Sequence, residues 1–144
     1  MTKDVGSNAS VKRVAGSPFI SLIIPVHNEE TQISQCLHSA YECFGFISEA
    51  RKRPSAENQN WALSQVEFIV VDANSSDGTH LSMKALCEEA QDHDLRLFYE
   101  LAPRGGRANQ MNHGASKASG QVLVFLHADT RLQRGFESEI RRFL

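Results

Sequence analysis

The sequence feature that most limits the fold is the stretch QVLVFLHADT at residues 121–130, where an apolar run ends abruptly at polar residues. Residues 122–126 are all apolar and do not alternate with polar ones. This pattern is typical of a strand buried on both faces of a parallel sheet, although a short buried helix also fits the periodicity. On a strand, His127 and Asp129 would project to the same face, so the two side chains could bind one cation. The alternative is a strand that simply ends in a polar turn.

Length and composition favour one globular domain. A chain of 144 residues with 41% hydrophobic and 22% charged residues can bury a core of its own, as soluble domains of this size do. The formal net charge of the chain is −2. Nucleic acid and anionic lipid are themselves negatively charged and attract proteins with an excess of basic residues, so this chain has no general attraction for either. We therefore expect no nucleic-acid partner, and a local site for any anionic ligand.

The cysteines indicate a reducing compartment. Cys36, Cys43 and Cys87 are an odd number without CxxC spacing, which favours buried thiols over disulfides or zinc ligands. No apolar run is long enough for a membrane span, and residues 1–17 lack the hydrophobic region of a signal peptide. We expect a cytoplasmic protein with no membrane span in this chain, in which residues 1–17 form a flexible leader to a domain at 18–144.

Alternating strand and helix patterns predict an α/β fold. Apolar strands are expected at 19–25, 66–71, 95–101 and 122–126. Apolar or small residues recur at helical spacing in four other stretches: Ile33, Cys36, Leu37, Ala40, Tyr41 and Phe44; Thr79, Met83, Leu86 and Ala90; Ala108, Met111, Ala115 and Ala118; and Phe136, Ile140, Phe143 and Leu144. Strands that alternate with amphipathic helices form a mainly parallel sheet with flanking helices.

Three polar or small residues are predicted to delimit these helices. Asn28 follows Pro25, the end of the first strand, and is expected to cap the first helix. Asp77 is expected to cap the second helix in the same way. Gly120 is expected to close the third helix as its C′ glycine.

Three strand ends are expected to bring polar side chains to one edge of the sheet, where ligands of open α/β sheets bind. We call residues 25–29, 72–77 and 127–129 the polar rim. Arg104 and Arg107 lie at the expected start of the third helix, where backbone N–H groups also favour anions. A cation-binding pair together with two guanidinium groups suits a nucleoside diphosphate, because both neutralise its negative charge.

Other phosphate-binding motifs fit poorly. The sequence has no GxxxxGK[ST], so a P-loop is disfavoured. Gly105 and Gly106 do not form GxGxxG and follow a weak strand, which argues against a Rossmann-type dehydrogenase. The two glycines could also form no more than a turn.

Three stretches resemble the signatures of glycosyltransferase family 2, in the same order and spacing: SLIIPVHNE at 21–29, IVVDANSSDGT at 69–79 and FLHAD at 125–129. The stretch RGGRANQMN at 104–112, together with LHADT at 126–130, resembles more closely the bacterial branch associated with radical-SAM and selenium-domain clusters. The resemblance extends over about residues 18–144.

This resemblance implies a GT-A fold whose first half binds a nucleotide-sugar and a divalent metal, Mn²⁺ or Mg²⁺. Pro25, His27 and Glu29 would line the nucleoside pocket, with the imidazole stacked on the base. Asp72 and Asn74 would close its other side. The remaining matches are Arg104 or Arg107 at the phosphates and Asp129 as the last carboxylate of the DxD motif, the metal ligand.

Two substitutions depart from the family pattern. Ala73 replaces the second aspartate after the second strand, often the residue that reads the base, so the nucleotide is not fixed by the resemblance. His127 replaces the first aspartate of DxD. Because imidazole is a softer ligand than carboxylate, Mn²⁺ should be tolerated better than Mg²⁺. Alternatively, His127 orients a water or a phosphate without touching the metal.

A third departure lies on the C-terminal side of the DxD motif. In this family the catalytic base and the acceptor-binding residues lie beyond the position that matches residue 144, and a further strand pairs beside 121–126. We therefore assign no catalytic residue and expect the donor-binding half of a glycosyltransferase with an unknown acceptor. The alternative is a non-catalytic, truncated nucleotide-binding or interaction module. A sugar-phosphate nucleotidyltransferase is a third possibility, but its glycine-rich loop does not follow the first strand here.

Overall fold

A parallel sheet organises the part of the chain that the computed structural model describes, residues 18–46 and 61–143. Its four strands lie in the order β3-β2-β1-β4. They are β1 (Ile20–Val26), β2 (Val66–Asp72), β3 (Arg96–Leu101) and β4 (Val122–Phe125), and every neighbouring pair is parallel. The predicted α/β class with a mainly parallel sheet is confirmed. The predicted leader at 1–17 lies outside the described residues.

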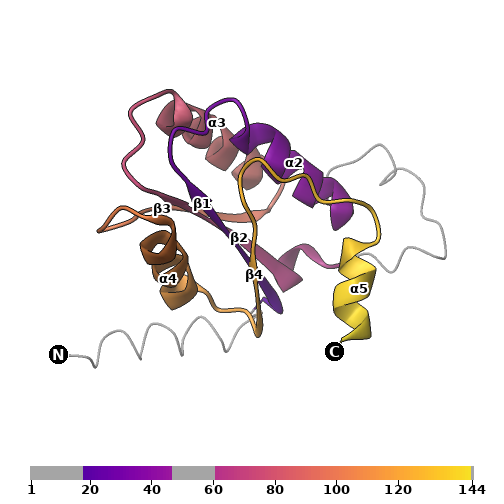
Figure 1. Ribbon diagram of the computed structural model, residues 1–144. Coiled ribbons are helices and arrows are strands. Elements are labelled where there is room, and N and C mark those ends of the chain that lie inside the picture. The colour runs from indigo at the N-terminus through magenta and orange to yellow at the C-terminus, as the bar shows by residue number, and fades with distance from the viewer. Residues whose placement is uncertain (1–17, 47–60, 144) are drawn as a thin grey trace.

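Helices cover both faces of this sheet. They are α2 (Ile33–Cys43), α3 (Thr79–Asp92), α4 (Arg107–Lys117) and α5 (Phe136–Arg142), with a short 3₁₀ helix, η2 (Leu63–Gln65), before β2. Figure 1 shows α2 and α3 together on one face and α4 on the opposite face. Each helix among the described residues is too short or too polar to cross a lipid bilayer.

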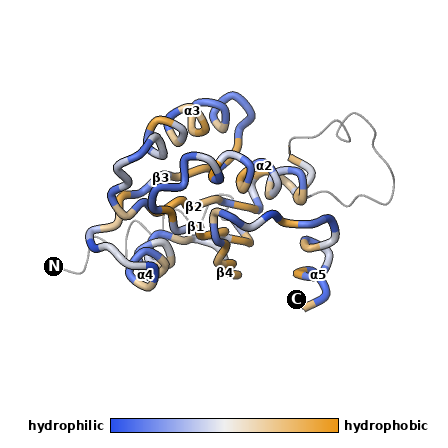
Figure 2. The backbone as a smooth tube through the Cα atoms, turned by 45° about the horizontal axis from the view of Figure 1, so that its top comes forward, coloured by the Kyte–Doolittle hydropathy of each residue, from blue (hydrophilic) through white to orange (hydrophobic). Residues whose placement is uncertain are grey.

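Side chains of β1 alternate between two apolar layers. Ile20, Leu22 and Ile24 point into the larger layer, under α2 and α3, whereas Ile23 joins Ile69 of β2 in a smaller layer under α4. The stripes predicted for α2 and α3 are confirmed, because the same residues are buried there. Figure 2 shows the hydrophobic strands between helices that carry both hydrophilic and hydrophobic residues.

The predicted stripe on α4 is wrong in part. Ala108 is exposed, and the buried residues of α4 are Gln110 and Gly114. A Cβ atom at Gly114 would lie 2.5 Å from Cγ2 of Ile23, so α4 approaches the sheet too closely for any larger residue. Ala115 and Ala118 do pack against the smaller layer, as predicted.

The expectation that β4 is buried on both faces is also wrong. Val122 and Val124 pack against the larger layer, but Leu123 and Phe125 on the other face are 40% and 47% exposed. The physical reason is position, since β4 lies at the edge of the sheet and α4 covers β1 and β2 instead. No strand pairs with the outer edge of β4 within the described residues.

Gly120 serves close packing and is not the predicted C′ glycine. α4 ends at Lys117, and its C-cap residue Ala118 is already extended. A Cβ atom at Gly120 would lie 2.5 Å from the hydroxyl of Ser21 and 2.7 Å from its backbone nitrogen. The glycine therefore allows the α4–β4 connection to pass directly against β1.

α5 packs beside the end of α2. The thiol of Cys43 donates to Oε2 of Glu137 at 3.2 Å, and the guanidinium of Arg141 lies 4.2 Å from the ring centroid of Trp61. Of the predicted apolar stripe, Ile140 packs against the core, but Phe143 is 87% exposed. Leu144 lies outside the described residues.

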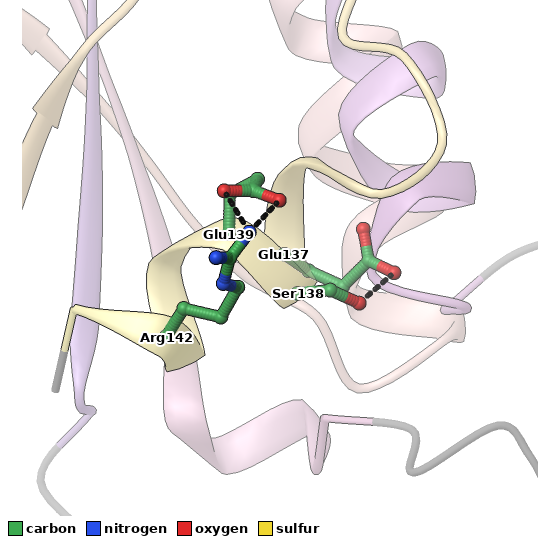
Figure 3. Close-up of polar contacts among 4 residues, drawn as sticks. All are labelled: Glu137, Ser138, Glu139 and Arg142. Carbon is green, nitrogen blue, oxygen red and sulfur yellow. Dashed lines mark hydrogen bonds and ion pairs between the residues drawn. The ribbon is translucent and has the colours of Figure 1, made fainter.

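The outer side of α5 is polar. Figure 3 shows Arg142 paired with both carboxylate oxygens of Glu139, at 3.2 and 3.4 Å, and the hydroxyl of Ser138 near Glu137. Both partners of the ion pair are well exposed, so the pair contributes little to stability.

A buried carboxylate connects the beginnings of β1, β2 and β4. Glu67, 2% exposed, accepts hydrogen bonds at Oε1 from the hydroxyl of Ser21 and the backbone N–H of Ser119, both at 2.6 Å. The hydroxyl of Ser21 in turn accepts from the N–H of Gly120 at 2.8 Å.

We predict that Glu67→Ala lowers the free energy of unfolding by about 2–4 kcal/mol, because two buried donors would lose their acceptor. Glu67→Gln keeps an oxygen acceptor and should cost about half as much. Urea denaturation followed by circular dichroism measures both. The control is Glu88→Ala on the exposed side of α3, expected within about 0.5 kcal/mol of wild type. Equal effects of Glu67→Ala and Glu88→Ala would contradict this role.

Candidate functional site

The polar rim lies where β1, β2 and β4 end. β1 and β2 are paired as far as Val26 and Asp72. Beyond β4, the N–H of Leu126 still donates to the carbonyl of Ile23 at 2.9 Å, so the chain enters residues 127–129 beside the end of β1. Pro25 is buried within β1 itself. The three segments predicted to meet at one edge therefore do so.

Asn28 connects two loops and does not cap α2 as predicted. α2 begins at Ile33 after Gln32, whose side chain makes no capping hydrogen bond. Asn28 has a left-handed backbone, with φ of 53°. Its Oδ1 accepts from the N–H groups of Ser76 at 2.8 Å and Asp77 at 3.3 Å. The amide thus caps the turn after β2, which sequence spacing cannot reveal because the two segments lie far apart in the chain.

Further hydrogen bonds join the same two loops. The exposed His27 bonds through Nδ1 to the carbonyl of Ala73 at 3.0 Å, which requires a proton on Nδ1. The N–H of Glu29 donates to Oγ1 of Thr79 at 2.8 Å. With the proton on Nδ1, Nε2 of His27 accepts from Nδ2 of Asn28 at 3.4 Å. The exposed His27 and the partly exposed Glu29 lie at the surface of the rim.

Asp77 lies one residue before Gly78, the N-cap of α3, and so is not the N-cap residue itself as predicted, but its side chain accepts hydrogen bonds from the first residue of the helix. Its Oδ1 accepts from the N–H of Thr79 at 2.9 Å and from the Thr79 hydroxyl at 2.5 Å. Desolvation is the largest single influence on the pKa of Asp77 and raises it. The hydrogen bonds from Thr79 and from the N–H of Glu30 together outweigh it, and the pKa is lowered.

Asp72 is turned into the protein, not toward the surface of the rim. The residue is 1% exposed. Its Oδ1 accepts from the N–H of Ser75 at 2.8 Å and from the Ser75 hydroxyl at 2.7 Å. Its Oδ2 accepts from the hydroxyl of Tyr99 on β3. Asn74, by contrast, is exposed, with a left-handed φ of 55°.

Gln110 brings the start of α4 to the rim. Its buried Nε2 donates to the carbonyls of Val26 at 2.8 Å and Val71 at 2.9 Å, at the ends of β1 and β2. Arg107, the first residue of α4, is exposed at this end of the helix. Arg104 is also exposed, in the loop after β3, on the opposite side of the sheet from β4. Arg107 thus belongs to the helical turn that Gln110 holds at the rim, whereas Arg104 belongs to the loop before it.

His127 and Asp129 are both exposed, whereas Ala128 between them is 2% exposed and packs in the core. The N–H of Thr130 donates to the carbonyl of His127 at 2.9 Å, which closes a turn. Within residues 18–46 and 61–143, no group of three or more His, Cys, Asp or Glu residues could hold a metal. Any cation bound at Asp129 would therefore take most of its ligands from phosphate oxygens and water, as Mg²⁺ commonly does in phosphate sites.

Arg131 is a residue of the site that the sequence analysis missed. Its Nη1 donates to the carbonyls of Ala128 at 3.0 Å and Thr130 at 3.1 Å. Its Nη2 donates to the side-chain carbonyls of Gln32 at 2.5 Å and Gln35 at 2.9 Å on and before α2. The guanidinium thus fixes the turn that carries Asp129 against the start of α2. The only signal in the sequence was a basic residue two positions after Asp129.

Cys36 lies beneath this turn. Its thiol donates to the carbonyl of His127 at 3.6 Å. Burial raises the pKa of Cys36 to about 11, Arg131 acts in the opposite direction, and Asp129 and Glu29 raise the pKa further. The thiol of Cys36 therefore lies within the electrostatic reach of both the loop after β1 and the turn after β4.

Substitutions at Asn28 test whether side-chain hydrogen bonds hold the loops of the rim together. Asn28→Ala should lower the free energy of unfolding by about 2 kcal/mol, because it removes an acceptor for two N–H groups and places a Cβ-bearing residue without local hydrogen bonds at positive φ. Asn28→Gly removes only the amide, since glycine tolerates this backbone, and should cost about 1 kcal/mol. Urea denaturation of both variants provides the comparison. An alanine variant as stable as wild type would refute the assignment.

The lowered pKa of Asp77 predicts that the stability of the folded protein depends on pH. Because its pKa is lowered on folding, its charge stabilises the native state above the unfolded pKa of about 4, and this stabilisation is lost as pH falls through the lower native value. Thermal melts of wild type and Asp77→Asn should differ at pH 7 and converge as the pH approaches about 3. A difference that stays constant over this range would show that the charge of Asp77 makes no contribution.

Comparison with known proteins supports the family resemblance. A model of "Glycosyl transferase family 2" matches residues 21–140. Glycosyltransferase AglE of Haloferax volcanii is 32% identical over 112 residues, which are 78% of this chain and 31% of that protein. This chain therefore spans about a third of the length of that relative.

Two solved structures share the fold. S. aureus TarS 1-349 in complex with UDP has a TM-score of 0.64 at 20% identity, covering 87% of this chain and 31% of the other. The mannosyltransferase PcManGT from Pyrobaculum calidifontis, in complex with GDP-Man and Mn²⁺, has a TM-score of 0.65 at 19% identity, covering 94% and 41%. The predicted GT-A architecture is confirmed. Since the family model covers most of the sequence, the chain belongs to glycosyl transferase family 2.

Proposed function

We propose that this chain forms the donor-binding half of a metal-dependent glycosyltransferase, which transfers a sugar from a nucleotide-sugar to an acceptor. The observation that carries the proposal is the convergence of three loops on the end of β1, with Asp129 exposed in the third of them. Family membership supports the reaction class. The radical-SAM-associated branch and a cytoplasmic location remain predictions, the latter from three free cysteines.

The loop after β1 would bind the nucleoside. His27 is exposed, and its ring is held through Nδ1 by the carbonyl of Ala73. Such a fixed imidazole offers a flat face on which a base can stack. Pro25 and Glu29 would flank it, and Asn74 would close the opposite side. Asp72 would contribute by holding that side in place, because its own carboxylate is directed inward.

The diphosphate would lie between Asp129 and the start of α4. Arg107 is the better candidate for a phosphate contact, because Gln110 holds the first turn of α4 against the ends of β1 and β2. Arg104, in the preceding loop, would be the second. A guanidinium at a helix N-terminus neutralises phosphate charge together with the backbone N–H groups.

Asp129 would hold a divalent ion, with His127 as a second ligand or as the residue that orients a water or a phosphate. The donor set fits Mn²⁺ better than Mg²⁺, because an imidazole beside one carboxylate is softer than an all-oxygen site. When bound, such an ion neutralises the charge that develops on a departing diphosphate. PcManGT, which shares the fold, was solved with GDP-Man and Mn²⁺.

The chain's own contribution to the reaction would be positional. Arg131 keeps the turn bearing Asp129 against α2, and Asn28 keeps the nucleoside loop against the turn after β2. Fixed groups of this kind stabilise a developing charge without reorganising during the reaction. We assign no catalytic base to the described residues.

Asp129→Ala tests the proposed metal site. Calorimetric titration of wild type with UDP- and GDP-sugars should show binding that strengthens at least tenfold with Mn²⁺, whereas the variant should lose this dependence, because it lacks the carboxylate ligand. Asp92→Ala, at the exposed end of α3, is the matched control and should behave as wild type. Mn²⁺-dependent binding that persists in Asp129→Ala would reject the site.

A non-catalytic nucleotide-binding module would use the same rim. Consumption of the nucleotide-sugar distinguishes the two functions. Hydrolysis or transfer of the sugar by the protein supports the transferase, whereas tight binding without consumption of the donor, whichever acceptor is added, supports the module. Binding itself is common to both.

A further inference from the structure

A chain of hydrogen bonds runs from the edge strand β3 into the polar rim. Tyr99 on β3 donates its hydroxyl proton to Oδ2 of Asp72. Asp72 Oδ1 accepts from both the N–H and the hydroxyl of Ser75, and the same hydroxyl accepts from the N–H of Asn28 at 2.9 Å. Four residues from three separate elements are thus connected through one buried carboxylate.

The direction of each bond in this chain is fixed. The Tyr99 proton is committed to Asp72, so Nδ1 of His80, 3.1 Å from the Tyr99 oxygen, must be the donor in their contact. Burial is the main cause that raises the pKa of the Tyr99 hydroxyl, and the Asp72 carboxylate raises it further, so the phenol keeps its proton. Tyr99 therefore acts as a permanent donor to Asp72.

Asp72 is not accessible to a ligand in this arrangement. One oxygen accepts two hydrogen bonds and the other accepts the phenol, and the residue is 1% exposed. Ala73, the next residue, has no polar side chain, and its carbonyl is engaged by His27. A base in the rim would therefore not reach the carboxylate of Asp72.

We propose that Tyr99 is a positioning residue for nucleotide binding, which acts through Asp72 on the loops that carry Ser75 and Asn28. Asp72 holds these loops and does not contact the base. The inference rests on the proposed function and adds a residue that the family signatures do not include. It also implies that Asp72 does not discriminate between bases, so the affinities for uracil and guanine nucleotides should depend on Asp72 equally.

Tyr99→Phe removes the phenolic oxygen and keeps the ring. Without its donor, Asp72 should hold the Ser75 turn less firmly, and the amide hydrogens of Ser75 and Asn28 should exchange with solvent at least fivefold faster. Dissociation constants for UDP and GDP, measured with Mn²⁺, should both rise about tenfold, by factors equal within about twofold, in keeping with the loss of one hydrogen bond to a charged group.

Tyr41→Phe is the matched control. The hydroxyl of Tyr41 is buried and has no hydrogen-bond partner among the described residues, so its removal changes neither loop. We expect wild-type amide exchange and wild-type dissociation constants for this variant. Thermal melts of both variants should stay within a few degrees of wild type, which separates a local effect on the rim from global destabilisation.

The possible outcomes are distinct. Unchanged exchange at Ser75 and Asn28 in Tyr99→Phe, or faster exchange with unchanged nucleotide affinity, overturns the positioning role and leaves the proposed function standing. A loss of affinity for only one of the two nucleotides overturns the claim that Asp72 does not read the base. A wild-type protein that binds neither nucleotide overturns the proposed function, and the positioning role with it.

Discussion

The parallel pairing of β1 with a strand on each side is the constraint on which the site depends. β2 and β4 both align with β1 in the same direction, so the three strands must deliver their following loops to the same edge of the sheet. The segments are about fifty residues apart along the chain, and no local interaction could bring them together. The apolar layers under α2, α3 and α4 stabilise this pairing.

Beyond the strand ends, hydrogen bonds made by side chains, and not regular secondary structure, hold the loops in position. The side chain of Asn28 accepts hydrogen bonds from the turn after β2. Asp72 accepts from Ser75 in that same turn and from Tyr99 on β3. Arg131 donates to its own turn and to the side chains of Gln32 and Gln35. Loops held in this way are rigid without being helical or extended. This leaves the outward-facing His27 and Asp129 on a fixed frame, and fixed polar groups are those that bind a charged ligand with least loss of entropy.

Sequence patterns predicted the elements well and their surroundings less well. The stripes of α2 and α3 followed from apolar spacing alone, because these helices pack on a continuous sheet. The exposure of one face of β4 could not be predicted in this way, because an apolar run carries no information about whether a neighbouring helix covers it. The helical stripe of α4 was misread in part, at Ala108, because the packing of this helix also depends on Gly114 and Gln110, which hydrophobic periodicity does not detect. Three rim segments were predicted from the ends of strands. Arg131 and Tyr99 were missed because their partners lie far away in the sequence.

The most direct test of the central claim is the paramagnetic broadening of backbone amide signals by Mn²⁺. We predict that Mn²⁺ broadens the amides of residues 127–130 and 27–29 only when UDP or GDP is present, and leaves those at the exposed end of α3, such as Asp92, unchanged. Broadening that ignores the nucleotide, or that occurs away from the rim, would contradict a metal–nucleotide site at the end of β1.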